Sequence, residues 1–380
     1  MGYVAVKGGT QAIENAKDLL EYLRVNNAHE PIEVEQIESQ FRGAVDKIMG
    51  EGSLYSTEYA AIALKQSEGC VLEGAFVLRA FRATLSRKYY SSTINTEKMF
   101  VQRRISSSFR EIPGGQILGA TRDYIQRTLN TAVVAEDKEY FQNFKKEFED
   151  QLESEKLEEI HTYSKVIDIL KDQGLVKPVP YDQDQKIMDV TRVAIKFPAP
   201  RSARLQMLAR AETGGIMALG YSSMRGHGSV HPTVGELRVG LVDVHVKDSE
   251  QRERYIGKIK VTEAEMISKG GKGAKAKKGV PFYSVGYGLC FGQNETKAIC
   301  MGILDRAMRD GNHHAPAHDQ EFVLYHTDGI ESMGFTNHLK LPHYVTFQSG
   351  LKNLRDAMKR ADNNKVEEEK AKPEVSIETV

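Results

Sequence analysis

The sequence has few cysteines, no excess charge of either sign and no long apolar run. Its three cysteines are too few and too scattered for a disulfide framework, which indicates a reducing, cytoplasmic compartment. The 52 basic and 52 acidic side chains cancel, so we do not expect a nucleic-acid binder, although a balanced charge still permits local basic sites for phosphates. No apolar run approaches the length of a membrane span, so we expect no membrane association.

The N-terminus lacks the charged and then apolar segments of a signal peptide and opens on strand-like residues from Tyr3 to Val6. Lys7, Gly8 and Gly9 then predict a turn, which is followed by a helix. Backbone amides in a turn between a strand and a helix bind anions, and Lys7 adds positive charge, so these three residues are candidates for substrate binding. Complete phosphate-loop patterns are missing, and a plain tight turn is the alternative.

Apolar residues recur at helical spacing along most of the N-terminal third, whereas alternating and β-branched runs appear after residue 201. This pattern predicts a mixed α+β fold, in which a helical domain precedes a sheet-containing domain. We expect a mainly helical domain at 1–136, a charged helix and proline-containing linker at 137–200, an α+β domain with a histidine-rich site at 201–360, and a disordered tail at 361–380.

Local patterns predict individual elements within these regions. Strands are expected at 215–221, 237–246, 255–261 and 322–326, and helices near 121, at 294–308 and after 344. Cys290 and Cys300 are expected to be packed thiols. In the last helix, the residues expected to face inward are Phe347, Leu351, Leu354 and Met358.

Two arginines and a glycine turn form a candidate phosphate site inside the chain. Arg103 and Arg104 precede a Pro-Gly-Gly sequence that contains Gly114 and Gly115. Such a turn can expose backbone amides to a phosphate, and arginine supplies forked donors that match the phosphate oxygens. The alternative is a hairpin-like turn with arginines on its rim, and the sequence alone favours neither.

A polar, glycine-rich loop between residues 221 and 238 is a better candidate for a functional site than any helix predicted before it. It replaces apolar residues with donors, acceptors and a titratable ring, among them Arg225, His231 and Glu236. Functional groups are commonly carried on loops that a sheet holds in place. Asp319 adds a further carboxylate beside a predicted strand.

Two histidines in the segment His-Leu-Lys-Leu-Pro-His, His338 and His343, form a candidate metal site. Neutral imidazole binds divalent metals, but this spacing does not bring two rings together in a regular helix or strand. Pro342 favours a bend that aims both rings at one point. Two ligands do not complete a site, so others must come from the chain, a partner, water or a substrate. The alternative is one structural and one surface histidine.

Several of these segments together resemble one family, the PhnI-type subunit of the carbon-phosphorus lyase core complex. The match extends from Tyr3 to about Gln348, and its motifs are weak singly but specific when they occur together and in order. The motifs are Val4 to Gly9, Arg103 to Ser106, Ile112 to Gln116, Arg225-Gly226 with His231-Pro232 and Gly235-Glu236, Gly286 to Gly288 with Phe291-Gly292, Asp319 with 321–324, and His338 to Tyr344.

The resemblance implies a transferase that acts in phosphonate catabolism. Members of the family act with the complex to displace adenine from ATP by an alkylphosphonate oxygen, giving ribose 1-alkylphosphonate 5-triphosphate, and the isolated subunit acts as a purine nucleosidase. The resemblance also implies zinc, or another divalent metal, bound by His338 and His343 at the interface with the radical S-adenosylmethionine lyase subunit. The implied partners are core subunits of the PhnG, PhnH and PhnJ types and ATPase subunits of the PhnK and PhnL types, with two copies of the chain per complex.

Replacing a purine at the anomeric carbon passes through a cationic, oxocarbenium-like sugar and needs an acid that protonates the leaving base. We therefore expect Glu236 or Asp319 to stabilise the cation or orient the ribose, and His231 or a neighbouring acid to protonate the purine. The alternative function is a non-catalytic scaffold whose histidine pair contributes an interfacial zinc site to the lyase subunit. The residues expected to hold the triphosphate are Lys7, Arg103 and Arg104.

Overall fold

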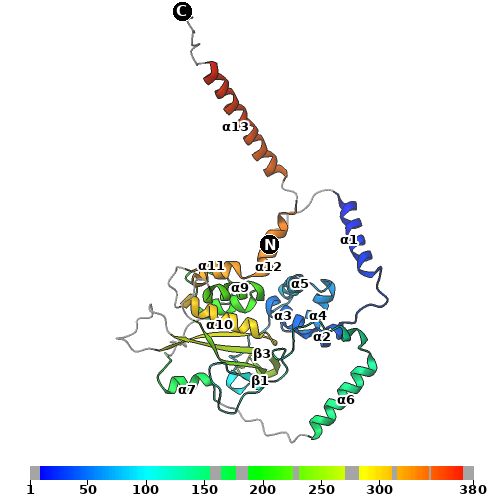
Figure 1. The fold of residues 1–380 in the computed structure, drawn as a ribbon, viewed down its shortest axis with the longest axis vertical. Helices are drawn as coiled ribbons and strands as arrows, with labels where there is room; N and C mark the ends of the chain where they lie inside the picture. The colour runs from blue at the N-terminus through cyan, green and yellow to red at the C-terminus, as the bar shows by residue number, and fades with distance from the viewer. Residues whose placement is uncertain are drawn as a thin grey trace, which may run out of the picture. The chain divides into compact units, whose positions relative to one another are not determined.

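The computed structural model describes residues 9–154, 164–176, 187–225, 231–269, 282–309, 315–341 and 344–370 (Figure 1). The chain divides into two compact units, one formed by Met1–His29 with Glu331–Val380 and the other by Glu30–Ile330. The strand expected at 3–6 lies outside the described residues, and the domain boundaries expected at 136, 200 and 360 stay predictions.

The larger unit is built around a four-stranded antiparallel sheet in the order β1-β2-β3-β4. Its strands are β1 (Phe100–Ile105), β2 (Thr233–Lys247), β3 (Glu253–Lys269) and β4 (Tyr283–Phe291). β2 and β3 pair as a long hairpin, which confirms the strands predicted at 237–246 and 255–261. β1 is far away in sequence and joins the edge of the sheet by pairing with β2. The mixed α+β class is therefore confirmed.

Helix α10 (Glu295–Arg309) packs on β3 and β4 because two glycines of β4 leave room for its backbone (Figure 1). A Cβ atom on Gly286 would lie 1.8 Å from the carbonyl oxygen of Gly302, and one on Gly288 would lie 2.0 Å from that of Ala298. No side chain fits at either distance, so these two positions bring α10 onto the sheet.

The core between this helix and the sheet is apolar. Helices α8 (Arg201–Arg210) and α9 (Thr213–Met224) pack on α10 and complete it. Burial raises the pKa of Cys290 to about 12 and that of Cys300 to about 11, which confirms both as packed thiols. Other core members are Leu208, Ile216, Leu237, Ala264, Met301 and Leu304.

A helical layer in the N-terminal part of the larger unit has a core of its own. It consists of α2 (Val34–Gln40), α3 (Arg42–Gly52), α4 (Thr57–Gln66) and α5 (Val71–Thr84). Their apolar stripes meet as the periodicity of the sequence predicts. The buried members include Ile37, Val45, Ile48, Leu64 and Leu78.

Two segments predicted as strands are helices, and those predictions are wrong. Residues 215–221 lie in α9, and residues 322–326 lie in α11 (Gln320–His326). In both cases a carboxylate just before the helix accepts hydrogen bonds from its first amides: Glu212 from Gly214 and Gly215, and Asp319 from Glu321 and Phe322. These caps favour the helix over the strand-like side-chain pattern.

The helix predicted near residue 121 is also absent, because the segment after Leu118 is held as an irregular loop. The guanidinium group of Arg103 donates to the carbonyl oxygen of Leu118 and forms an ion pair with Asp123. Later in the chain, α6 (Lys138–Ser154) agrees with the predicted charged helix. Helix α7 (Val166–Asp172) follows and contacts strand β2.

The smaller unit contains α1 (Thr10–Val25), the end of α12 (Gly329–His338) and α13 (Tyr344–Lys370). The predicted inward face of α13 is wrong: Phe347, Leu354 and Met358 are exposed, because no other described part of this unit covers them. The helix also continues to Lys370, whereas we expected the chain to lose order after residue 360. Its Glu and Lys residues are good helix formers even without a core. Among the described helices, none combines the length and hydropathy that a membrane span needs.

Candidate functional site

The sheet face opposite α10 carries a buried group of charged side chains, which we call the ionic face. It consists of Arg104, Glu236, Arg238, Glu263, Glu265 and Tyr287 on the four strands, together with Thr96 and Lys165 from covering segments. Successive side chains of a strand point to opposite faces. Glu263 and Glu265 therefore face away from Ala264, whose side chain lies in the α10 core.

Arg104 and Glu236 form the first pair of the ionic face. The Arg104 Nε atom lies 2.5 Å from Glu236 Oε1, and Glu236 Oε2 accepts a hydrogen bond of 3.0 Å from the Val166 amide. Arg104 also donates to the carbonyl oxygens of Pro113 and Ser164. The structure thus brings the buried side chains of Arg104 and Glu236 together and joins them to the exposed Pro-Gly-Gly turn.

Glu263 lies at the centre of the ionic face and accepts four kinds of donor. Lys165 Nζ and Thr96 Oγ1 each lie 2.8 Å from its Oε1, the Tyr287 hydroxyl lies 2.9 Å away, and Arg238 forms an ion pair with Oε2. Burial alone would raise the pKa of Glu263, but Arg238 and Lys165 outweigh it and lower the pKa to about 2. Glu263 is therefore a carboxylate at any working pH.

Glu265 has the opposite environment only two residues further along β3. It is 8% exposed, and within the described part of the chain its Oε2 atom has no hydrogen-bond partner. Lys165 Nζ is 3.6 Å from Oε1, too far for a hydrogen bond. Burial raises the pKa of Glu265 to about 7, since the nearby charge of Lys165 only partly offsets it and Glu263 adds to it. Glu265 can therefore gain or lose a proton near neutrality.

The other arginine of the predicted phosphate site points elsewhere. Arg103 donates to the Leu118 carbonyl, pairs with Asp123 and lies 3.0 Å from Glu295 through its Nε atom. Arg103 and Arg104 are 1% and 3% exposed, and protein acceptors hold both. Gly114 and Gly115 form an exposed turn with φ angles of 81° and 75°, which glycine adopts without strain.

The remaining candidates are dispersed. His231 and Arg225 are exposed, His231 just before β2 and Arg225 at the end of α9, and Asp319 caps α11. Gly9 is the exposed N-cap of α1 in the smaller unit. Arg225, His231 and Asp319 make no described contact with the ionic face. Lys7, Gly8 and His343 lie outside the described residues.

His338 ends α12, and its Nδ1 atom is hydrogen-bonded to the Phe335 carbonyl oxygen. A carbonyl only accepts, so Nδ1 carries the hydrogen and the lone pair of the ring is on Nε2. This is the tautomer that metal-binding histidines commonly adopt. His338 thus fits a metal ligand. Three or more potential ligands do not cluster anywhere in the described part of the chain.

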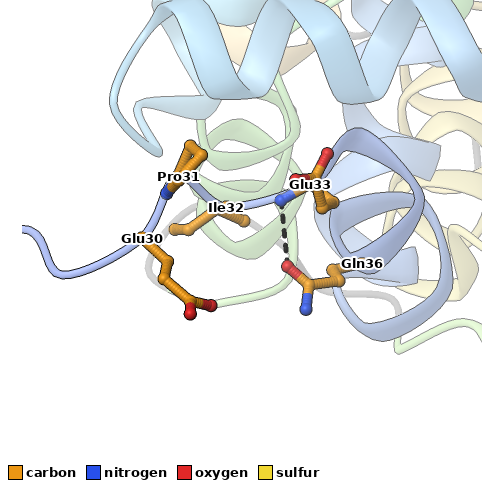
Figure 2. Close-up of a pocket in the computed structure, with 5 residues that line it drawn as sticks. All are labelled: Glu30, Pro31, Ile32, Glu33 and Gln36. Carbon is orange, nitrogen blue, oxygen red and sulfur yellow. Dashed lines mark hydrogen bonds between the residues drawn. The ribbon is translucent and has the colours of Figure 1, made fainter.

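A shallow pocket at the start of α2 is lined by Glu30, Pro31, Ile32, Glu33 and Gln36 (Figure 2). Its polar groups serve the helix end: the Glu33 amide donates a 2.9 Å hydrogen bond to the Gln36 side chain, as one half of a capping box. We therefore assign no ligand to this pocket.

Sequence reasoning missed most of the ionic face, namely Lys165, Arg238, Glu263, Glu265 and Tyr287. One signal was present. Glu263 and Glu265 occupy alternate positions on either side of Ala264, so they face the same side of the sheet, and buried carboxylates on one face need partners.

Comparisons with known proteins agree with the resemblance drawn from the motifs. The family described as "Bacterial phosphonate metabolism protein (PhnI)" matches residues 2–361. The protein HtxH of Stutzerimonas stutzeri is 44% identical over 370 residues, which cover 95% of this chain and 97% of HtxH. Two proteins named alpha-D-ribose 1-methylphosphonate 5-triphosphate synthase subunit PhnI are also similar. The one from Rhizobium meliloti (strain 1021) is 40% identical over 95% of this chain and 96% of its own length, and the one from Escherichia coli (strain K12) is 41% identical over 93% and 97%. The chain therefore belongs to the PhnI family of bacterial phosphonate metabolism proteins.

Proposed function

We propose that the chain is a subunit of the carbon-phosphorus lyase pathway that displaces adenine from ATP with an alkylphosphonate oxygen, giving ribose 1-alkylphosphonate 5-triphosphate. The observation that carries the proposal is the family match over residues 2–361, with two relatives named as synthase subunits for a product of this type. When water replaces the phosphonate, the same displacement is a purine nucleosidase reaction. The partners are the other subunits of the lyase complex.

The ionic face supplies a candidate acid for the leaving purine. A general acid works best when its pKa is near the working pH, and that of Glu265 is about 7. Glu265 is therefore a better candidate than the exposed His231. Glu236 keeps its proposed role of stabilising the cationic sugar, because Arg104 and the Val166 amide fix its carboxylate in a buried place where a charge acts strongly.

The test is adenine release from ATP with methylphosphonate, followed together with the ribose product by phosphorus NMR, for the full chain alone and with its partner subunits. We expect Glu265→Gln to lower adenine release roughly 100-fold or more. The control is Glu250→Gln, which should leave adenine release unchanged because Glu250 is exposed at the β2–β3 turn, where it pairs with Arg252. Full turnover by a folded Glu265→Gln protein would remove Glu265 from the reaction. Absence of adenine release in every assembly would overturn the proposed function.

We also propose that His338 and His343 bind zinc. The observation in favour is the tautomer of His338, which presents Nε2 as the lone-pair atom. When bound, zinc supplies a Lewis acid or a link to a partner subunit. The second candidate function, a scaffold with an interfacial metal, rests on the same observation.

His338→Ala separates these two roles. His326→Ala is the matched control, because His326 makes the same Nδ1 contact, 2.7 Å to the Phe322 carbonyl. Loss of zinc from the assembled complex with normal adenine release would support the scaffold role. Loss of both would place the metal in the first reaction, and an unchanged zinc content would refute the site.

A further inference from the structure

Three arginines surround one buried aspartate on the α8–α10 side of the sheet, and we call them the arginine cluster. Arg201 donates to both oxygens of Asp305 through Nε and Nη2, at 2.9 and 2.6 Å. Arg309 lies 4.0 Å from the same carboxylate and donates to the Ser284 hydroxyl. Arg204 is the third member, one turn after Arg201 on α8.

Within the described part of the chain, Arg204 has no carboxylate of its own. Asp305 is the one carboxylate among the described charged groups that act on Arg204, and Arg201 already occupies both of its oxygens. The Tyr287 amide takes a further acceptor site at 3.0 Å. Burial, with the like charges of Arg201 and Arg309, lowers the pKa of Arg204. Excess charge in a half-buried place is unfavourable unless an anion joins it.

Donors of the cluster remain available. Arg204 donates once, from Nη1 to the Ala199 carbonyl at 2.7 Å; its Nε atom is buried without a hydrogen-bond partner in the described part of the chain, and the residue is partly exposed. Arg201 uses Nε and Nη2 for Asp305, and its side chain is also partly exposed. Residues three apart share one face of a helix, so the two groups can reach a single ligand. Arg201 is also the first residue of α8, where the amides of the helix favour an anion.

We propose that Arg201, Arg204 and Arg309 form a binding site for a polyphosphate-type oxyanion. Resting on the proposed function, the site takes the triphosphate group of the nucleotide. Planar, forked donors match the oxygens of phosphoryl groups, and several donors suit a chain of them. The assignment also explains where a triphosphate can bind when Arg103 and Arg104 are enclosed by protein acceptors.

Calorimetry on the full chain tests the site with four probes: tripolyphosphate, ATP, inorganic phosphate and methylphosphonate. Tripolyphosphate and ATP should bind, and the affinity should fall as salt is raised. Arg204→Gln should weaken both by about tenfold or more, since a hydrogen bond between charged groups is lost. Arg204→Lys should recover part of the affinity. Arg252→Gln, which removes the same charge from an exposed position, should change nothing.

The outcomes separate this site from the proposed function. Tripolyphosphate binding that is insensitive to Arg204→Gln, in a variant that unfolds at the wild-type temperature, would overturn the site whatever the turnover. Tighter binding of methylphosphonate than of tripolyphosphate would also overturn it, because the site would then serve the phosphonate. Arg204-dependent tripolyphosphate binding without adenine release in any assembly would support the site and overturn the proposed function.

Discussion

Two groups of charged side chains meet strand β4 and differ in how their charges balance. On the ionic face, the carboxylate of Glu263 forms ion pairs with both Arg238 and Lys165. In the arginine cluster, one aspartate faces several guanidinium groups. Tyr287 links the two, since its hydroxyl donates to Glu263 and its amide to Asp305.

The comparison teaches what each group is for. A balanced and enclosed network fixes the strands and sets the pKa of Glu265, whereas an unbalanced and partly exposed group requires a ligand of opposite charge. Balance can be tested by removing single charges, and the effects on stability should differ in size.

The largest effect should follow removal of the central carboxylate. Glu263→Gln keeps the shape of the side chain but removes the counter-charge that the buried Arg238 and Lys165 share, and leaves Lys165 only its longer 3.6 Å contact with Glu265 among the described ion pairs. We expect the free energy of unfolding to fall by about 3 to 5 kcal/mol, measured by urea denaturation. The exposed pair of Glu250 with Arg252 provides the control, for which Glu250→Gln should cost less than about 1 kcal/mol. Equal costs would mean that the ionic face is not a coupled network.

The sequence predicted these elements unevenly, and the reasons are physical. The strands of the β2–β3 hairpin and helix α10 follow from local periodicity, which the fold preserves. The strand predictions for residues 215–221 and 322–326 were wrong because, in each case, a single carboxylate caps the first turn and favours a helix. The contact between Arg104 and Glu236 depends on a strand pairing between residues 132 positions apart, and no local pattern encodes it.

A smaller effect should appear in the pH dependence of stability, through Glu265. Its pKa is raised on folding from an ordinary 4.5 to about 7, so the folded state binds the proton more tightly than the unfolded state. The stability gained from that proton is present below about pH 4.5 and is lost as the pH rises through about 7. We expect a loss of about 3 kcal/mol at most across this window.

Urea denaturation at several pH values between 5 and 8 measures this slope. Glu265→Gln removes the titrating group and should flatten it, whereas Glu250→Gln should leave it as in the wild type. Glu263 contributes in the opposite direction, because its lowered pKa stabilises the fold above its ordinary value and the gain is lost only as the pH falls toward about 2. A wild-type stability that rises between pH 5 and 7 would contradict the assignment of Glu265.

The smallest effect on stability should come from the arginine cluster, and it gives the most direct comparison with the ionic face. Arg204→Gln removes a charge that has no carboxylate of its own in the described part of the chain, and one hydrogen bond to the Ala199 carbonyl. These terms oppose each other, so we expect the free energy of unfolding to change by less than about 0.5 kcal/mol without ligand. Arg238→Gln removes an equal charge from the balanced network and should cost several times more, since it leaves Glu263 underpaired. With tripolyphosphate present, wild type should gain stability and Arg204→Gln should gain less, because only a bound anion supplies the missing charge. A large loss from Arg204→Gln without ligand would show that both groups are structural and that the contrast between them is one of exposure alone.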